Sequence, residues 1–251
     1  MTNRSWGIIV IGDEILSGRR QDRHLQKTIE LLAPRHENLQ FAHYIGDDEE
    51  QIVTTLQTTM QGDATVFCFG GIGGTPDDLT RQCAAIAAGV ELVRNPEAVE
   101  LIEARFGKDA YPMRIRMSDL PEGCELIPNP YNRIPGFRIG HHHFLPGFPV
   151  MAHPMMEWIL ETHYSIDIPA DYIESAIYLH GTPESSIVET MEQMIDCYKD
   201  VRFFSLPIHR EGSGINLIEF GVKGKTSDVE VAMEDLKSKL AEMNVIWTEE
   251  R

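Results

Sequence analysis

Residues 64–89 read ATVFCFGGIGGTPDDLTRQCAAIAAG. The first six residues are nearly all apolar, and a short continuous apolar run is typical of a strand that is buried on both faces. A loop with four glycines follows, and the spacing of apolar residues after it predicts a helix that begins near Pro76 or Asp77. A buried strand, a glycine loop and a helix in this order predict one repeat of an α/β fold.

The chain before this stretch contains the same alternation twice. Residues 5–11 (SWGIIVI) predict a buried strand and residues 22–33 predict a helix. Residues 41–45 and 47–60 predict the next strand and the next helix. Three such alternations predict a doubly wound α/β sheet, whose ligands normally bind beyond the carboxyl ends of the strands.

The chain after this stretch is less regular. Residues 96–118 look helical, whereas residues 121–149 contain prolines and short apolar pieces that are typical of turns and a hairpin. Residues 150–164 predict one more helix, with Pro154 in its first turn or at a kink.

The C-terminal part predicts a second domain. From residue 172 the expected order is strand, helix, strand, strand, helix, strand, which is the order of a ferredoxin-like unit. We therefore predict an α/β domain over residues 1–167 and a smaller α+β ferredoxin-like domain over residues 168–251.

The composition narrows the classes of function. The 251 residues include 39 acidic and 22 basic side chains, for a formal charge of -17, so we expect no nucleic-acid partner and no binding to anionic membranes. Four cysteines without a CxxC pair indicate neither a zinc ribbon nor a disulfide framework. The apolar run at the N-terminus is too short for a signal peptide or a membrane span, so we predict a cytoplasmic protein.

The glycine loop predicts an anion site. Backbone N–H groups of glycines can approach a ligand closely, and the positive end of the following helix would point to the same place. The loop matches neither the phosphate loop GxxxxGK[ST] nor the dinucleotide pattern GxGxxG. Because Asp77 and Asp78 stand where a lysine would be expected, we predict that Mg²⁺ or a similar divalent cation bridges them to phosphate. In the alternative interpretation, the two aspartates only cap the helix.

A second acidic stretch, IGDEILSG at residues 11–18, ends the first predicted strand. Gly12 permits a tight turn, and Asp13 and Glu14 project at the carboxyl end of the strand. Since the carboxyl ends of parallel strands lie at one edge of a sheet, we expect this stretch and the glycine loop to share that edge. The alternative is an ordinary solvated turn.

A third stretch, LPGFPVMAHP at residues 145–154, contains a glycine between prolines ahead of a predicted helix. Pro146 and Gly147 predict a rigid turn that leaves donor groups at the start of the helix. Arg133 and Arg138 are the expected countercharges for a phosphate, although each is an ordinary surface residue in the alternative interpretation.

The run of three histidines, His141–His143, predicts a hairpin turn rather than a metal site. Adjacent residues of a strand point to opposite faces, so three consecutive histidines cannot all bind one ion without distortion.

Three segments resemble one known family, and they occur in the family's order. IGDEILSG resembles the pattern IGxExLxG, and FGGIGGTPDDLT at residues 69–80 resembles TGGxGPTxDDxT. Pro135–Phe137 and then LPGFPVMAHPM resemble a PGF turn followed by LPGxPxEM. The patterns are those of molybdopterin-binding domains of the MoaB and Mog type (MoCF domains), most closely the N-terminal domain of CinA proteins and the related domain of FAD synthases. The resemblance covers about residues 5–160.

The resemblance implies a three-layer α/β/α sandwich that binds a phosphorylated pterin or an adenine dinucleotide, and a homo-oligomer that is a dimer or a trimer. CinA-like members are associated with metal-dependent hydrolysis of pyrophosphate bonds in ADP-ribose or FAD. Transferred to this sequence, the ligand-binding positions are Gly12, Glu14, Gly70, Gly71, Gly73, Thr75, Pro146 and Gly147. The catalytic positions are Asp77 and Asp78, which would bind the metal together with Glu14.

The sequence departs from the family patterns at three positions. Phe69 replaces the usual threonine, Gly74 replaces the usual proline, and we assign Ala152 to the position of the usual glutamate of LPGxPxEM. The first change removes a hydroxyl and the last removes a carboxylate, so the resemblance supports binding better than it supports catalysis.

Three functions remain open at this point. The first is hydrolysis of ADP-ribose or FAD at the pyrophosphate bond. The second is binding of molybdopterin or its adenylylated form in molybdenum cofactor assembly. In the third, the site is vestigial and the ferredoxin-like domain makes the chain an assembly or regulatory module.

Overall fold

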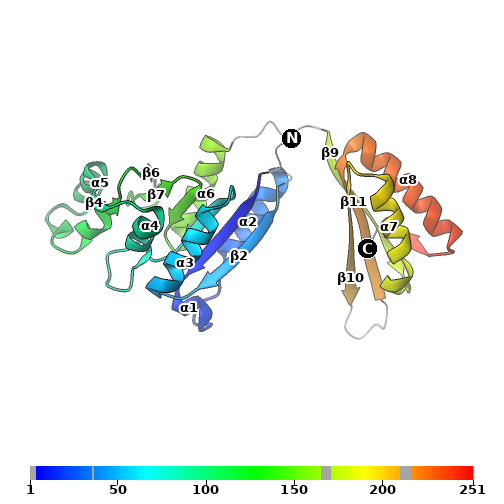
Figure 1. Cartoon of the computed structure of the whole chain (residues 1–251), viewed down its shortest axis with the longest axis horizontal. Helices are drawn as coiled ribbons and strands as arrows, with labels where there is room; N and C mark the ends of the chain where they lie inside the picture. The colour runs from blue at the N-terminus through cyan, green and yellow to red at the C-terminus, as the bar shows by residue number, and fades with distance from the viewer. Residues whose placement is uncertain (1–3, 36, 165–170, 210–215, 251) are drawn as a thin grey trace. The chain divides into compact units, whose positions relative to one another are not determined.

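The computed structural model describes residues 4–35, 37–164, 171–209 and 216–250 (Figure 1). The chain forms two compact units, residues 1–167 and residues 168–251, and each unit has its own sheet and its own core. In the part of the chain that is described, no helix is both long enough and apolar enough to cross a membrane.

The N-terminal unit is built on a six-stranded sheet with the order β2-β1-β3-β8-β7-β6. The strands are β1 (Trp6–Ile11), β2 (Leu39–Ile45), β3 (Thr65–Phe69), β6 (Glu125–Ile127), β7 (Gly136–Ile139) and β8 (His142–Leu145). β1 pairs in parallel with β2 and β3, and β3 pairs in parallel with β8. β7 and β6 continue the sheet in antiparallel pairing, so the doubly wound sheet has an antiparallel edge.

Helices cover both faces of this sheet (Figure 1). The helices are α1 (Asp13–Leu16), α2 (His24–Leu32), α3 (Glu49–Met60), α4 (Thr80–Ala88), α5 (Pro96–Phe106) and α6 (Pro149–His163), with a short 3-10 segment η1 (Ala33–Arg35) after α2. In β1, Ile8 packs into a core with residues of α2 and α6, while Ile9 packs into a second core with residues of α3, α4 and α5. Alternate residues of the strand thus serve the two faces, and the predicted three-layer α/β/α sandwich is confirmed.

Only the first half of residues 96–118 forms an α-helix. Asn95 caps α5 by accepting from the Ala98 N–H at 3.0 Å, and Gly107 with a φ of 56° ends it. The chain then forms the 3-10 segments η2 (Gly107–Ala110) and η3 (Arg114–Ser118). The strands β4 (Leu92–Arg94) and β5 (Asp119–Pro121) pair beside this excursion. Helical backbone is therefore confirmed over residues 96–110 and 114–118, but after Phe106 it is of the 3-10 type.

The predicted hairpin is present as β7 and β8, but the histidine run is not all in its turn. His141 is exposed in the turn, whereas His142 and His143 lie in β8 and are 2% and 0% exposed. His142 reaches Thr59 of α3, and His143 lies beside Tyr164 after α6. The two side chains enter opposite faces of the sheet, as strand alternation requires.

The C-terminal unit is an antiparallel sheet in the order β10-β11-β9-β12 with two helices packed on it. Its elements are β9 (Tyr172–His180), η4 (Glu184–Ser186), α7 (Val188–Cys197), β10 (Arg202–His209), β11 (Asn216–Lys225), α8 (Thr226–Glu242) and β12 (Trp247–Thr248). Ile177, Phe220 and Leu236 are among its fully buried residues. This element order and sheet order are those of a ferredoxin-like unit, so the predicted fold class is confirmed.

Candidate functional site

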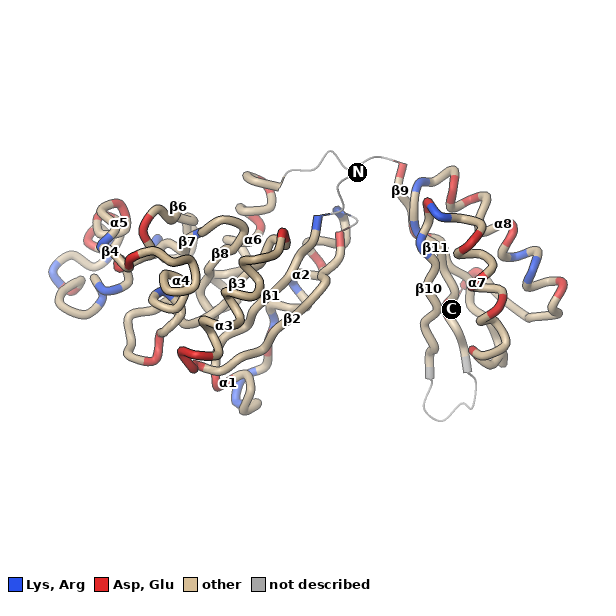
Figure 2. The backbone as a smooth tube through the Cα atoms, in the orientation of Figure 1, with Lys and Arg blue, Asp and Glu red and all other residues tan. Residues whose placement is uncertain are grey.

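The ligand-binding, catalytic and metal positions that the family resemblance implied line one cavity at the carboxyl ends of β1, β3 and β8. The cavity has a volume of about 440 Å³. Its lining includes Gly12, Glu14, Gly70, Gly71, Gly73, Thr75, Asp77, Asp78, Pro146 and Gly147. We call it the glycine-loop cavity. Figure 2 shows acidic residues on the loop before α4 and at the start of α3, on the same side of the unit.

The glycine loop presents bare backbone to this cavity. Gly70 and Gly71 have φ angles of 102° and 66°, which side chains rarely allow. A Cβ at Gly70 would lie 2.2 Å from the Ile11 carbonyl oxygen, so the loop packs directly on the end of β1. Within the described residues, the backbone N–H groups of 71–74 donate to no other atom of the chain. Consecutive free N–H groups in such a loop are typical of an anion site.

Helix α4 begins at Thr80, later than the predicted start near Pro76 or Asp77. The Thr80 N–H donates to the Gly71 carbonyl at 2.9 Å, and the Thr80 hydroxyl donates to the Gly70 carbonyl at 2.9 Å. The carbonyls of the glycine loop thus accept both hydrogen bonds that the first residue of the helix donates. The capping interpretation is also wrong, because neither Asp77 nor Asp78 caps α4.

The two aspartates instead surround Thr75. Its hydroxyl oxygen lies 2.5 Å from Asp77 Oδ1 and 2.6 Å from Asp78 Oδ2, and its backbone N–H donates to Asp78 Oδ2 at 2.8 Å. One hydroxyl carries one proton, so Thr75 donates to one carboxylate at a time and the other oxygen contact has no hydrogen. The Thr75 hydroxyl holds the pKa of the Asp77 carboxyl below its usual value.

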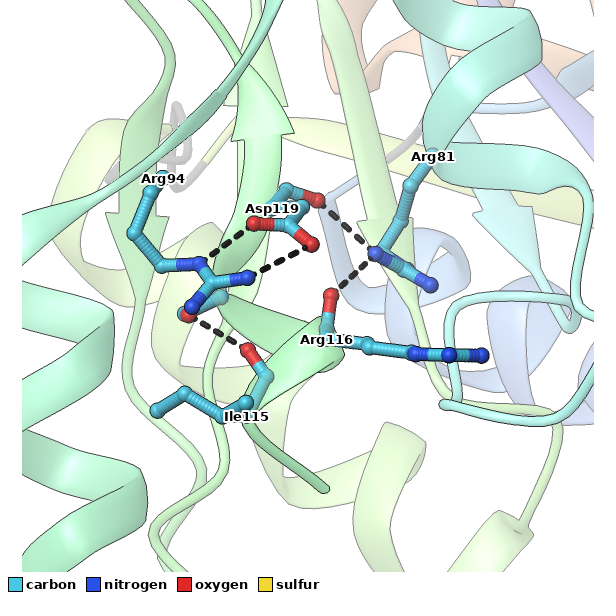
Figure 3. Close-up of polar contacts among 6 residues, drawn as sticks. Arg81, Arg94, Ile115, Arg116 and Asp119 are labelled. Atoms are coloured by element: carbon cyan, nitrogen blue, oxygen red, sulfur yellow. Dashed lines mark hydrogen bonds and ion pairs between the residues drawn. The ribbon is translucent and has the colours of Figure 1, made fainter. Parts of the chain in front are cut away.

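Arg81 holds the middle of the glycine loop in place through a hydrogen bond to Gly73. It is 6% exposed, and its guanidinium donates to the Gly73 carbonyl at 2.9 Å. The same guanidinium donates to the carbonyls of Arg116 and Asp119 at 2.5 and 2.9 Å (Figure 3). Burial lowers the pKa of Arg81. The Asp119 carboxylate in turn accepts two hydrogen bonds from Arg94 (Figure 3), so Arg81 ties the loop to the segment that includes η3 and β5.

A further acidic residue, Asp47, lines the cavity and was not predicted. The Asp13 N–H donates to Asp47 Oδ2 at 3.0 Å, and the Asp47 N–H donates to Asp13 Oδ1 at 3.3 Å. Burial raises the pKa of the Asp47 carboxyl, and three carboxylates raise it further, those of Asp13, Glu14 and Asp77. The signal was available in the sequence, because Ile-Gly-Asp occurs at 11–13 and again at 45–47, after two neighbouring parallel strands.

Among the described residues, Arg20 is the basic residue that lines the cavity. Its guanidinium lies 3.8 Å from Glu14 Oε1 and 5.4 Å from the centre of the Phe148 ring. The expected countercharges are elsewhere: Arg138 pairs with Glu125 at 2.7 Å, and neither Arg138 nor Arg133 lines the cavity. Those two predictions were wrong because proximity in sequence to the LPG turn does not give proximity to its cavity.

The described residues contain no group of three or more His, Cys, Asp or Glu side chains arranged to hold a metal ion. Asp77, Asp78 and Glu14 line the same cavity, but a metal bound by them remains a proposal.

The assignment of Ala152 to the glutamate position of LPGxPxEM was wrong. Counted from Leu145, the glutamate is the seventh residue of the pattern, which is Met151 in this chain. Ala152 is 0% exposed in the core, whereas Met151 lines the cavity and lies 3.3 Å from the side-chain nitrogen of Asn132. Consecutive helical residues point about 100° apart, so only one of the two can face the cavity.

The other departures also have a place in the structure. Phe69 is fully buried and stacks on His24, with ring centres 4.1 Å apart and planes 7° apart. Gly74 lines the cavity beside Met117. Asn129 and Asn132 complete the lining on this side, and no motif in the sequence marked them.

Comparison with known proteins agrees with this geometry. Residues 7–164 match the family described as "Probable molybdopterin binding domain". A CinA-like protein from Citrifermentans bemidjiense is 33% identical over 195 residues, and the match covers 75% of this chain and 47% of that protein. The chain thus spans about half the length of that relative. A protein from Pyrobaculum calidifontis is 29% identical over 196 residues, with 75% of each chain covered.

Among solved structures, the CinA protein of unknown function from Thermoplasma acidophilum is 25% identical, with a TM-score of 0.58. The match covers 63% of this chain and 98% of that one. The chain belongs to the molybdopterin-binding-domain family, and CinA-like proteins are among its relatives.

Proposed function

We propose that this chain binds an adenine dinucleotide, of the ADP-ribose or FAD class, in the glycine-loop cavity and hydrolyses its pyrophosphate bond with the help of a divalent cation. The observation that carries the proposal is the row of free N–H groups at 71–74, which opens into the same cavity as Asp77 and Asp78. Backbone N–H groups bind phosphate oxygens, and a chain with a charge of -17 needs such local neutralisation.

The side chains fit a hard divalent cation such as Mg²⁺. The side-chain atoms beside the glycine loop that could bind a metal ion are all oxygens, from Thr75, Asp77 and Asp78. Glu14 adds one more carboxylate to the cavity. Mg²⁺ is usually held by one or two carboxylates together with substrate phosphates and water, so these residues would hold it only with the ligand. When bound, the cation would neutralise charge on the phosphates during cleavage.

Residues of this chain would bind the phosphates, activate the attacking water and orient the carboxylates. The loop N–H groups hold the phosphates, and Arg20 adds the positive charge that lines the cavity. Asp47 is the candidate general base for an attacking water, because its carboxylate lines the cavity beside the glycine loop. Burial raises the pKa of this carboxyl. The short contacts around Thr75 orient Asp77 and Asp78 toward one point.

A second function is favoured by Met151. The carboxylate that the family pattern places at this position is absent, and a thioether lines the cavity instead. A site that keeps its phosphate-binding backbone and lacks this carboxylate suits binding of molybdopterin, or of its adenylylated form, without turnover. Fluorescent pterin that copurifies with the protein would support this alternative, and pterin-free protein that hydrolyses a dinucleotide would exclude it.

The test of the proposed function is a hydrolysis assay with ADP-ribose, FAD and NAD in the presence of Mg²⁺, Mn²⁺ or Co²⁺. Asp78→Asn should lower turnover by about 100-fold or more, and dinucleotide affinity should change far less, because asparagine keeps the acceptor for the Thr75 N–H but loses the charge.

The matched control is Asp63→Asn, an exposed aspartate in the same unit that lies outside the glycine-loop cavity. Turnover and dinucleotide affinity of this variant should equal those of the unchanged protein. No turnover by the unchanged protein with any of these substrates and metals would contradict the proposed hydrolysis.

A further inference from the structure

The first two residues of α4 hold the glycine loop from outside its cavity. The Thr80 hydroxyl donates to the Gly70 carbonyl and the Thr80 N–H donates to the Gly71 carbonyl, both at 2.9 Å. The Arg81 guanidinium donates to the Gly73 carbonyl at 2.9 Å. Thr80 and Arg81 are buried, and neither lines the glycine-loop cavity. Three carbonyls of the loop are therefore bound from the side of the helix.

These hydrogen bonds set the direction of the N–H groups in the loop. In a trans peptide unit, the carbonyl of one residue and the N–H of the next point in opposite directions, and the peptide bonds of the loop are trans. A carbonyl that points to α4 thus directs the following N–H to the cavity side of the loop. The N–H groups concerned are those of Gly71, Ile72 and Gly74, which line the cavity and have no acceptor among the described residues.

Arg81 also places a positive charge behind the loop. Within the described residues, its guanidinium forms no ion pair, and the Asp119 carboxylate pairs with Arg94 instead (Figure 3). Burial lowers the pKa of Arg81, and the carboxylates of Asp119 and Asp78 oppose that shift. Arginine stays charged in proteins, and buried charges are normally paired. A bound anion on the other side of the loop would supply the missing negative charge.

We propose that Thr80 and Arg81 are positioning residues that aim the free N–H groups of the glycine loop, and that Arg81 acts on a bound phosphate through the Gly73–Gly74 peptide. This inference rests on the proposed binding of a nucleotide pyrophosphate at the glycine loop. A hydrogen bond from a cation to a carbonyl polarises the peptide, which makes the N–H at its other end a stronger donor.

This arrangement explains how the loop binds phosphate without the lysine of a phosphate loop. The guanidinium supplies its charge from behind the backbone and does not enter the cavity. Arg20 at the cavity wall is 59% exposed, so solvent screens its charge, whereas the buried charge of Arg81 is screened much less.

Two variants separate the charge of Arg81 from its hydrogen bond. Arg81→Lys keeps the charge and a donor for Gly73, whereas Arg81→Gln keeps a donor and loses the charge. The probe is the α,β-methylene analogue of ADP-ribose, which resists hydrolysis at the phosphate bridge, and calorimetric titration of the full chain with Mg²⁺ measures its binding. Arg81→Lys should bind within about 3-fold of the unchanged protein, and Arg81→Gln should bind at least about 10-fold more weakly.

The matched control for the lost charge is Arg116→Gln. This exposed side chain lies outside the cavity lining, and Arg81 uses only the backbone carbonyl of Arg116. The affinity of this variant should equal that of the unchanged protein.

Thr80 provides an independent pair of variants. Thr80→Val removes the hydroxyl that binds the Gly70 carbonyl at nearly constant shape, whereas Thr80→Ser keeps it. Thr80→Val should weaken binding of the analogue by at least about 3-fold, and Thr80→Ser should restore the affinity of the unchanged protein.

The amide nitrogen signals of the ligand-free chain report the positioning directly, because a hydrogen bond to a carbonyl polarises the next N–H. In nuclear magnetic resonance spectra, Arg81→Gln should shift the nitrogen signal of Gly74 and leave that of Gly71 in place. Thr80→Val should shift the signal of Gly71 and leave that of Gly74 in place. Movement of both signals in both variants would mean that Thr80 and Arg81 only brace the loop, and would overturn the inference.

The binding outcomes separate this inference from the proposed function. Equal affinities of the Arg81→Lys and Arg81→Gln proteins, or of the Thr80→Val and Thr80→Ser proteins, overturn the inference and leave nucleotide binding at the loop intact. Melting temperatures establish that each variant is folded, and if neither Arg81 variant folds, the Thr80 pair decides. Absence of binding by the unchanged protein contradicts the proposed function, and the nitrogen signals then still test the positioning.

Discussion

At the scale of single residues, His142 and His143 show how burial changes the chemistry of a side chain. Burial lowers the pKa of His142 to about 4 and that of His143 to about 3. The Thr59 hydroxyl donates to carbonyls of its own helix, so it accepts from His142 Nε2. Both rings are therefore neutral structural groups, one on each face of β8.

His142 predicts a specific loss of stability in acid. Its pKa is lower in the folded chain than in the unfolded chain, so its contribution is fully present above about pH 6.5 and is lost as the pH falls toward about 4. His142→Gln keeps a donor for Thr59 and does not titrate. The free energy of unfolding of this variant, relative to the unchanged protein, should rise by about 3 kcal/mol between about pH 7 and about pH 4.

Urea unfolding at a series of pH values measures this difference. His43→Gln, at an exposed histidine of β2, is the control for the replacement of a histidine by glutamine. A constant difference between His142→Gln and the unchanged protein across this range would show that His142 titrates normally in the folded state.

At the scale of elements, the site is made by the turns and loops at the carboxyl ends of the parallel strands. Turns after β1 and β2 supply Asp13 and Asp47, the loop after β3 supplies free N–H groups, and the turn after β8 supplies Gly147. Parallel strands place these segments at one edge. The backbone of the glycine loop is constrained, because Ile11 contacts it at Gly70 and Thr80 contacts it at Gly71.

Two glycines with nearly the same φ separate backbone strain from close packing. Gly71 has a φ of 66° and a Cβ there would lie 2.2 Å from Thr80 Oγ1, whereas Gly89 has a φ of 70° and open space around it. Gly89→Ala should cost about 1 kcal/mol of unfolding free energy, from the left-handed conformation alone. Gly71→Ala should cost at least about 1 kcal/mol more and should abolish nucleotide binding, because the loop must move away from α4.

Chemical denaturation and titration with a non-hydrolysable ADP-ribose analogue measure the two effects. Equal costs for the two alanine variants would mean that the loop yields to a Cβ without loss, contrary to the packing against Thr80.

At the scale of the whole molecule, two units carry separate cores. In residues 1–167, one hydrophobic cluster lies on each face of the six-stranded sheet. In residues 168–251, one cluster lies between the sheet and its helices. All the residues that line the glycine-loop cavity belong to the first unit. Assembly into a dimer or trimer remains a prediction, which sedimentation can test.

The separate cores predict two unfolding transitions. A segment of residues 1–164 should fold alone, because its sheet and cores are complete within it. In calorimetry it should melt within about 3 °C of one of two transitions of the full chain. A single transition of the full chain, absent from the isolated segment, would show that the two units fold only together.

Nucleotide binding should follow the same division. The isolated segment should bind a non-hydrolysable ADP-ribose analogue with the affinity of the full chain, since the glycine-loop cavity is lined by its residues alone.

The sequence by itself determined the layered fold and the backbone part of the site. Apolar runs and helical spacing are local signals, and they identified β1, β2, β3 and most of the helices. The fourth parallel strand, β8, was expected only as part of a hairpin. The glycine loop, Glu14 and Gly147 could be predicted because each directly follows or precedes such an element. The same rule applied to Ile45-Gly46-Asp47 would have found Asp47.

Only the tertiary structure decided which other side chains meet there. Asn129, Met151 and Arg20 lie in turns, in helix starts or in the chain after α1, where a residue's direction depends on the helix face and on the path of the loop. Arg81 turns inward to bind Gly73 although it is charged, because its guanidinium donates to three backbone carbonyls in place of water. Local spacing fixes where elements begin, whereas the pairing of buried polar groups depends on contacts between distant segments, which only the folded chain creates.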